Sequence, residues 1–184
     1  LAGGRASEAI QLYRELIKEL PGNTGLVMNL GLALYSAEQY RKAIEQFQLV
    51  LNKNPRVTPA WLMLGLAHLK LGNPAQAVEP LQRVLTTDPE NQVARLELAD
   101  TYLTLGRPRE AAGEFRKLTE LAPGHAKAWQ GLGLSYAAAA RRSFADLEKI
   151  APESSYRYAL AARSRAEERR DQTAFRLYRG AETR

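Results

Sequence analysis

Apolar and polar residues alternate along almost the whole chain with the spacing of amphipathic helices. Apolar residues recur at steps of three and four in stretches such as 60–71 (AWLMLGLAHLKL) and 75–87 (AQAVEPLQRVLTT). This spacing predicts helices that each present one apolar face. Short polar, glycine- or proline-containing segments separate the stretches at residues 37–40, 72–74 and 106–108. Such segments predict tight turns, so we expect the helices to form antiparallel pairs.

A step of 34 residues relates these pairs to one another. It is kept by Pro21, Pro55, Pro89 and Pro123, by Ala43, Ala77 and Ala111, by Gly31, Gly65 and Ala99, and by Phe47, Leu81 and Phe115. The small residues allow the two helices of a pair to approach closely, and each proline ends the second helix. Because one pair cannot bury its apolar face alone, successive pairs are expected to stack into a solenoid.

With these features the chain resembles the tetratricopeptide repeat family. The resemblance rests on Trp61, Leu64, Gly65, Ala77, Leu81, Val84 and Pro89 and on their counterparts one repeat away. It extends over essentially the whole chain and implies an all-α fold, a right-handed α-solenoid of antiparallel helix pairs. It also implies a non-catalytic scaffold that binds a protein or peptide segment in a concave groove lined by the first helix of each pair.

The repeat predicts three parts. Residues 1–125 are expected to form the regular solenoid, with a half repeat at 1–23 and full repeats at 24–57, 58–91 and 92–125. Residues 126–154 form a shortened repeat, and residues 155–184 a terminal helix pair.

The shortened repeat has lost its turn. Tyr102 and Ala111 are nine positions apart, but their counterparts Tyr136 and Ala140 are only four apart. The remaining bridge, AAAARR at 137–142, is made of strong helix formers, and the apolar stripe continues across it. We therefore expect one fused helix from 126 to 150, on whose second half the terminal pair packs. A cramped hairpin of two shortened helices is the alternative.

Composition and charge add little to this picture. The chain has no cysteine, which excludes disulfides, thiolate metal sites and cysteine nucleophiles. Its net charge of +6 comes mainly from residues 126–184. That basic tail could bind nucleic acid, but an arginine-rich solvated helix face explains it better, so no nucleic-acid partner is predicted. No apolar run approaches the length of a membrane span, which is about 18 residues or more.

The source and compartment stay open. The N-terminus has no start methionine and no signal core, so we expect a piece of a longer protein. The Ala-, Arg- and Leu-rich composition is typical of a bacterial protein, of the cytoplasm or the periplasm.

Residues with catalytic spacing are lacking. His68 is expected as a satisfied core histidine and His125 as a solvated residue of an inter-repeat turn, while Gly131 and Gly133 are expected to serve helix packing. No metal-ligand cluster, nucleophile motif or phosphate loop appears. The sequence therefore predicts no catalytic, cofactor-binding or metal-binding residue, and no enzyme.

The candidate site is the concave groove. Its predicted residues are Asn29, Leu32, Met63, Leu66, Lys70, Glu97, Asp100 and Lys127. Some relatives bind the C-terminal carboxylate of chaperones with a Lys/Asn/Arg set, of which only Asn29 is present here, so chaperone-tail binding is not expected. The groove is apolar at first and acidic later. The alternative is that some of these leucines, Leu62 and Leu69 above all, only pack between neighbouring first helices.

Two alternative functions remain at this point. In the first, the chain is a regulatory or targeting segment of a larger protein or enzyme. In the second, it is a self-association module. The second alternative rests on the uncapped ends of the solenoid, where at least one of Ile10, Tyr13, Phe175 and Tyr178 is expected to be partly exposed or to meet another copy.

Overall fold

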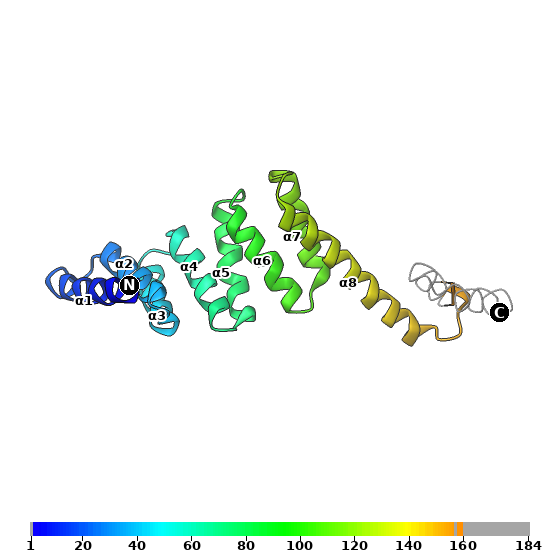
Figure 1. The fold of residues 1–184 in the computed structure, drawn as a ribbon, viewed down its shortest axis with the longest axis horizontal. Helices are drawn as coiled ribbons and strands as arrows, with labels where there is room; N and C mark the ends of the chain where they lie inside the picture. Colours follow the sequence, from blue (N-terminus) through cyan, green and yellow to red (C-terminus); the bar gives the residue numbers. More distant parts are fainter. Residues whose placement is uncertain (1, 157, 160–184) are drawn as a thin grey trace. The chain divides into compact units, whose positions relative to one another are not determined.

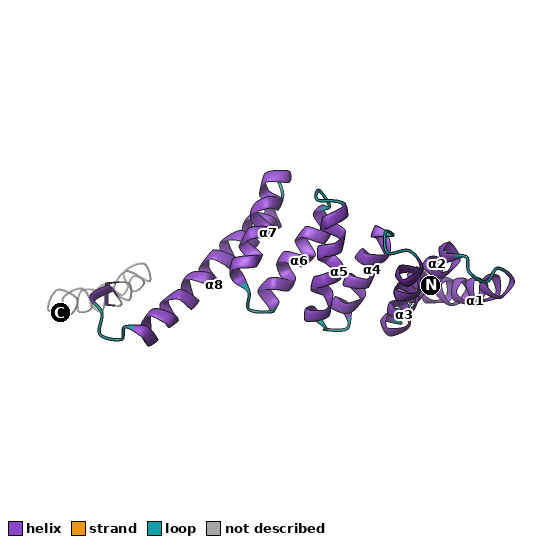
Figure 2. Ribbon diagram, turned by 180° about the vertical axis from the view of Figure 1, so that it is seen from behind, coloured by secondary structure: helices purple, strands orange, loops and turns teal. Residues whose placement is uncertain are grey.

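The computed structural model describes residues 2–156, 158 and 159, and within them every regular element is a helix (Figures 1 and 2). The helices are α1 (Ala2–Glu19), α2 (Thr24–Ser36), α3 (Tyr40–Lys53), α4 (Thr58–Lys70), α5 (Pro74–Thr87), α6 (Gln92–Thr104), α7 (Pro108–Leu121) and α8 (Ala126–Ile150). Contacts divide the chain into two compact units, whose boundary lies inside α8, between Ser135 and Tyr136. The three-part division predicted from the repeat is a different division and stays a prediction.

Within the first unit, consecutive helices pack as a solenoid. The pairs α2–α3, α4–α5 and α6–α7 each form a hairpin, and α1 packs on α2 (Figure 1). Each second helix also packs on the next first helix, α3 on α4 and α5 on α6, while the first helices α2, α4 and α6 contact one another in order. The predicted all-α solenoid of helix pairs is confirmed.

The helix ends follow from local chemistry. Asn23 and Asn91 cap α2 and α6, because their side-chain oxygens accept hydrogen bonds from backbone N–H groups of the first turn, such as Ala94 N–H at 3.0 Å. Proline stands at the start of α5 and α7, where its missing N–H costs no hydrogen bond. The turns before these prolines contain Gly72 and Gly106 with positive φ, a conformation that glycine adopts without strain.

A glycine opposite a bulky side chain sets the distance between the helices of the pairs α2–α3 and α4–α5. A Cβ atom on Gly31 of α2 would lie 2.6 Å from the ring of Phe47 in α3, which is fully buried. Likewise, a Cβ atom on Gly65 of α4 would lie 2.9 Å from Leu81 in α5. Each close approach lies within a core cluster of buried side chains. One cluster surrounds Phe47, and the other surrounds Leu81 and Phe115. Trp61 packs against both clusters.

In the repeats 58–91 and 92–125, the side chain of the fourth residue ties the first helix to the proline that precedes the repeat. The indole Nε1–H of Trp61 donates to the carbonyl oxygen of Pro55 at 2.8 Å. In the next repeat Arg95 takes this position, and its guanidinium donates to the carbonyl of Pro89 and pairs with Glu114 of α7. Both charges of this pair are largely buried, so either one left alone would be costly to the fold.

Helix α8 runs unbroken through the shortened repeat, over 25 residues (Figure 1). The predicted fused helix is confirmed, and the cramped hairpin is wrong, because a run of alanine and arginine offers the backbone no favoured turn conformation. The expectation for the two glycines holds only for Gly131, where a Cβ atom would lie 2.3 Å from Phe115 of α7. Gly133 faces open space instead, because the hairpin partner that covers its counterpart Gly65 is missing.

Of the two described residues that were candidates for exposure at the N-terminal end, Ile10 and Tyr13, only Tyr13 is partly exposed. Ile10 of α1 is buried, at 4% exposure, because it takes part in the core cluster around Phe47, whereas Tyr13 is half-buried. Phe175 and Tyr178 lie outside the described residues, as does most of the terminal pair predicted at 155–184.

We predict opposite effects of two Gly→Ala substitutions. Gly31→Ala should lower the free energy of unfolding by about 1–3 kcal/mol, because the added methyl group overpacks the buried ring of Phe47. Gly113→Ala in α7 should raise it by about 0.5–1 kcal/mol, because its Cβ meets nothing within 4 Å and alanine is the better helix former. Urea denaturation followed by circular dichroism measures both. Equal effects of the two substitutions would contradict the close-approach account.

Candidate functional site

The residues predicted for the groove all lie on first helices of the first unit. Asn29 and Leu32 belong to α2, Met63, Leu66 and Lys70 to α4, Glu97 and Asp100 to α6, and Lys127 to the first half of α8. We call this set the first-helix surface. Because α2, α4 and α6 contact one another in order, its positions follow one another as a band along the first helices of three repeats, and Lys127 adds a position on α8.

The apolar part of the first-helix surface is half-buried. Leu32 and Met63 contribute to the core cluster around Phe47, so part of each side chain serves packing between repeats. Leu66 is half-buried as well. Asn29 and Lys70 are exposed. Leu62 and Leu69 pack against the neighbouring cluster around Phe115, as the packing alternative expected of them.

The acidic part contains an ion pair. The Nζ of Lys127 lies 2.8 Å from an Oδ of Asp100. This hydrogen bond raises the pKa of Lys127, burial opposes it, and the negative charges of Asp100 and Glu97 add to the increase. Within the described residues no ion pair forms at the Glu97 carboxylate itself. The structure therefore brings Glu97, Asp100 and Lys127 together, with one negative charge in excess.

Sequence reasoning missed Tyr35, which lies close enough to Glu97 to feel its charge. Burial raises the pKa of the Tyr35 phenol, and the neighbouring Tyr40 and Glu97 raise it further. The rings of Tyr35 and Tyr40 meet edge to face, with centroids 5.2 Å apart. The signal in the sequence was an aromatic residue where the next two repeats have Leu69 and Leu103.

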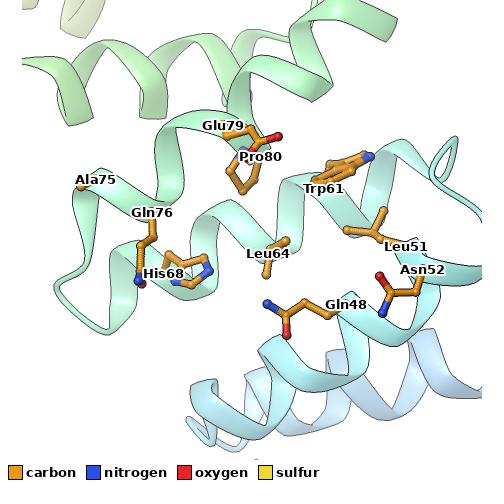
Figure 3. Close-up of a pocket in the computed structure, with 10 residues that line it drawn as sticks. All are labelled: Gln48, Leu51, Asn52, Trp61, Leu64, His68, Ala75, Gln76, Glu79 and Pro80. Atoms are coloured by element: carbon orange, nitrogen blue, oxygen red, sulfur yellow. The ribbon is translucent and has the colours of Figure 1, made fainter.

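A separate cavity of about 430 Å³ opens between α3, α4 and α5 (Figure 3). It is lined by Gln48, Leu51, Asn52, Trp61, Leu64, His68, Ala75, Gln76, Glu79 and Pro80. None of these is a residue of the first-helix surface. Its lining comes from α3 and α5, which are second helices of two successive pairs, and from α4 between them. The cavity is therefore a candidate site distinct from the first-helix surface, with both polar and apolar lining.

His68 does not behave as the expected satisfied histidine. Its Nδ1 is buried and has no hydrogen-bond partner within the described part of the chain. Burial lowers the pKa of His68, and a hydrogen bond of the imidazole to the neighbouring Gln76 offsets part of that decrease. His125 departs from expectation too, because it is half-buried and its Nδ1 accepts a hydrogen bond from Ala128 N–H at 3.1 Å, which caps α8.

The described residues also bear on metal binding and on insertion into a membrane. Over residues 2–156, 158 and 159, no three or more His, Asp or Glu side chains are grouped so that they could hold a metal ion. Over the same ranges, no helix is both long enough and apolar enough to cross a membrane.

The helix pairs, the repeat and the band of first-helix residues define a repeat protein of the α-solenoid class. Two tetratricopeptide repeat family models match residues 28–92 and 68–134, which together make up more than half of the chain. The chain belongs to the tetratricopeptide repeat family.

Solved structures share the fold. A crystal structure of MamA is similar with a TM-score of 0.71 and 24% identity, over 76% of each chain. YrrB is similar with a TM-score of 0.69 and 24% identity, over 82% of this chain and 80% of that one. The second tetratricopeptide domain of human RPAP3 has a TM-score of 0.54 and 20% identity, over 58% of this chain and 88% of that domain. No curated protein matches the chain.

The lowered pKa of His68 predicts a pH-dependent stability. Since the folded state takes up the His68 proton less readily than the unfolded state, whose pKa is near 6.5, stability from this group is complete above that pH and decreases as the pH falls through it. The free energy of unfolding should therefore fall between pH 7.5 and 5.5. In His68→Gln that fall should be smaller, as measured by urea titrations at each pH. An unchanged pH dependence in the variant would contradict the assignment to His68.

Proposed function

We propose that the chain is a non-catalytic scaffold that holds a peptide segment of another protein on the first-helix surface. The observation that carries the proposal is the combination, on one band of three packed helices, of half-buried apolar side chains and an acidic group with excess negative charge. A peptide with an apolar residue and a basic residue would match both parts.

The apolar part supplies affinity. Leu32, Met63 and Leu66 are each only half-buried, so each offers apolar area that a ligand would remove from water. Two of them are anchored by their packing in the core, which lowers the entropy lost on binding. The flexible side chain of Met63 adapts to partners of irregular shape.

The acidic part supplies orientation. A Lys or Arg of the ligand would be attracted to Glu97 and would compete with Lys127 for Asp100. Charges at one end of a groove influence register and the association rate more than affinity. The phenol of Tyr35, which lies in the field of Glu97, adds an aromatic neighbour at the same end.

Two similar structures support a peptide ligand in general but not its identity. YrrB is described as a tetratricopeptide protein with an unusual peptide-binding site, and the RPAP3 domain is in complex with the HSP70 peptide SGPTIEEVD. That peptide is acidic at its C-terminal end, so Glu97 and Asp100 would repel it. A basic ligand fits the first-helix surface of this chain better.

The test begins with selection of binding peptides from a random phage-displayed library on the wild-type chain. The double charge reversal Glu97→Lys with Asp100→Lys should weaken the selected peptide at least about tenfold, since like charges then meet across the contact. The matched control is Glu45→Lys with Glu120→Lys, on exposed positions of α3 and α7, which should leave the affinity unchanged. Isothermal titration calorimetry measures the dissociation constants.

A second variant tests the apolar part of the same surface. Met63→Ala should weaken the selected peptide by about 1 kcal/mol or more if Met63 lies at the centre of the contact. If Met63→Ala and the charge reversal both bind as tightly as the wild type does, the ligand lies elsewhere and the proposal is wrong.

A further inference from the structure

Helix α8 presents a helix-pairing face that no other helix covers within residues 2–156, 158 and 159, the part of the chain that the structure describes. In the first two pairs the glycine of the first helix is covered by a bulky side chain, Gly31 by Phe47 and Gly65 by Leu81, and in the third pair Ala99 stands in its place. The corresponding residue of α8 is Gly133, and a Cβ built on it meets nothing within 4 Å. Trp129, one turn earlier on this face, is 54% exposed, although its counterpart Trp61 packs against the core.

The residues that would cover this face are present in the second half of the same helix. In α7, Ala111, Phe115 and Leu118 follow one another at steps of four and three, and all are fully buried. Ala140, Phe144 and Leu147 of α8 repeat the same residue types at the same steps. Phe144, however, is 44% exposed. The chain therefore retains both halves of a helix pair but has lost the turn that would let them meet.

The residue spacing along one continuous α-helix, Ala126–Ile150, makes its two halves complementary between copies. Gly133 and Phe144 are eleven residues apart, which is about three full turns, so they point to the same side of α8 to within about 20°. If two copies of α8 lie antiparallel on this side, the Phe144 ring of each meets the Gly133 of the other. The two-fold axis then falls near Ala138, where the small side chains of Ala137 and Ala140 allow close approach.

We propose that the occupant of this face is a second copy of the chain, in a helix-swapped dimer built on α8. Each copy supplies the second helix that the shortened repeat of the other lacks, so the contact of Gly133 with Phe144 repeats that of Gly31 with Phe47. The interface is isologous and closes on itself, as expected of a stable two-fold dimer. Loss of a hinge turn is a recognised route to such swapping.

This dimer differs from association through the solenoid ends, because its contacts lie at the centre of α8. It is also independent of the first-helix surface: Trp129 and Gly133 belong to the face that a hairpin partner would cover, whereas Lys127 pairs with Asp100 of α6. A peptide ligand and the second copy can therefore be tested separately.

The first experiment restores the missing turn. In the wild-type chain, analytical ultracentrifugation should give twice the mass of 20.5 kDa. Replacement of residues 137–139 by the eight residues of 103–110, which contain the α6–α7 turn, should convert the dimer to a monomer with similar helix content. If the wild-type chain is a monomer, for example because residues 155–184 cover the face within one chain, the proposal is wrong. A dimer that survives restoration of the turn also overturns it.

Point variants locate the contact. Phe144→Glu should raise the dimer dissociation constant about a hundredfold or more, because a buried aromatic contact is lost and a charge must be desolvated. Ile150→Glu is the matched control, since Ile150 is 83% exposed on the same half of α8 and outside the repeated set of apolar positions. Equal dissociation constants for Phe144→Glu and the wild type would contradict the assigned interface.

Cysteine cross-linking tests the pairing directly, because the chain has no cysteine of its own. Gly133→Cys and Phe144→Cys are prepared as separate chains, mixed and oxidised. A disulfide between the two variants is expected, whereas the mixture of Gly133→Cys with Ile150→Cys should give none. Absence of the first cross-link in a dimeric sample, or equal yields from both mixtures, overturns the antiparallel register.

Discussion

The solenoid depends on a close contact between a small residue on one helix, glycine in the first two pairs and Ala99 in the third, and a bulky side chain on the next. Where Gly31 faces Phe47 and Gly65 faces Leu81, the backbone of the first helix touches the side chain of the second. The separation of the helices, the burial of both core clusters and the stacking of repeats follow from this contact. A methyl group at either glycine would force the pair apart, because protein interiors are packed too densely to absorb it.

The same contact explains why α8, which departs from the regular helix pair, is informative. Its first half keeps Gly133 and its second half keeps Phe144, but the bridge of alanine and arginine favours helix over turn. Local helix propensity therefore prevents a tertiary contact that the flanking residues are still suited to make. The proposed helix-swapped dimer would satisfy both, because the second half of α8 then pairs with the first half of α8 in another copy.

Periodicity predicted most of the fold. The step of 34 residues located the helix pairs, and the steps of three and four across Ala137–Ala140 predicted the fused helix, because both follow from backbone geometry and side-chain size alone. Side-chain hydrogen bonds were less predictable. The pairing of Arg95 with Glu114, the cap from His125 and the unpartnered Nδ1 of His68 depend on which atoms meet in three dimensions.

The candidate site was predictable to a similar degree. Repeat position placed its residues on first helices, but it did not show that Lys127 pairs with Asp100 or that Tyr35 lies near Glu97. Those contacts join different repeats, and the period and spacing of a single sequence carry no signal for them. They change the expected site from two free carboxylates to a cluster with one negative charge in excess.

The most direct test of this account is a distance measured along α8. Nitroxide labels are attached at the exposed positions Gln130 and Lys149 through introduced cysteines, and the labelled chain is diluted with excess unlabelled chain so that only distances within one copy are seen. Double electron–electron resonance should give a backbone separation of about 28 Å, the length of nineteen residues of continuous helix. A separation of about 10 Å, the spacing of two packed helices, would show that α8 folds back as a hairpin and would contradict the account.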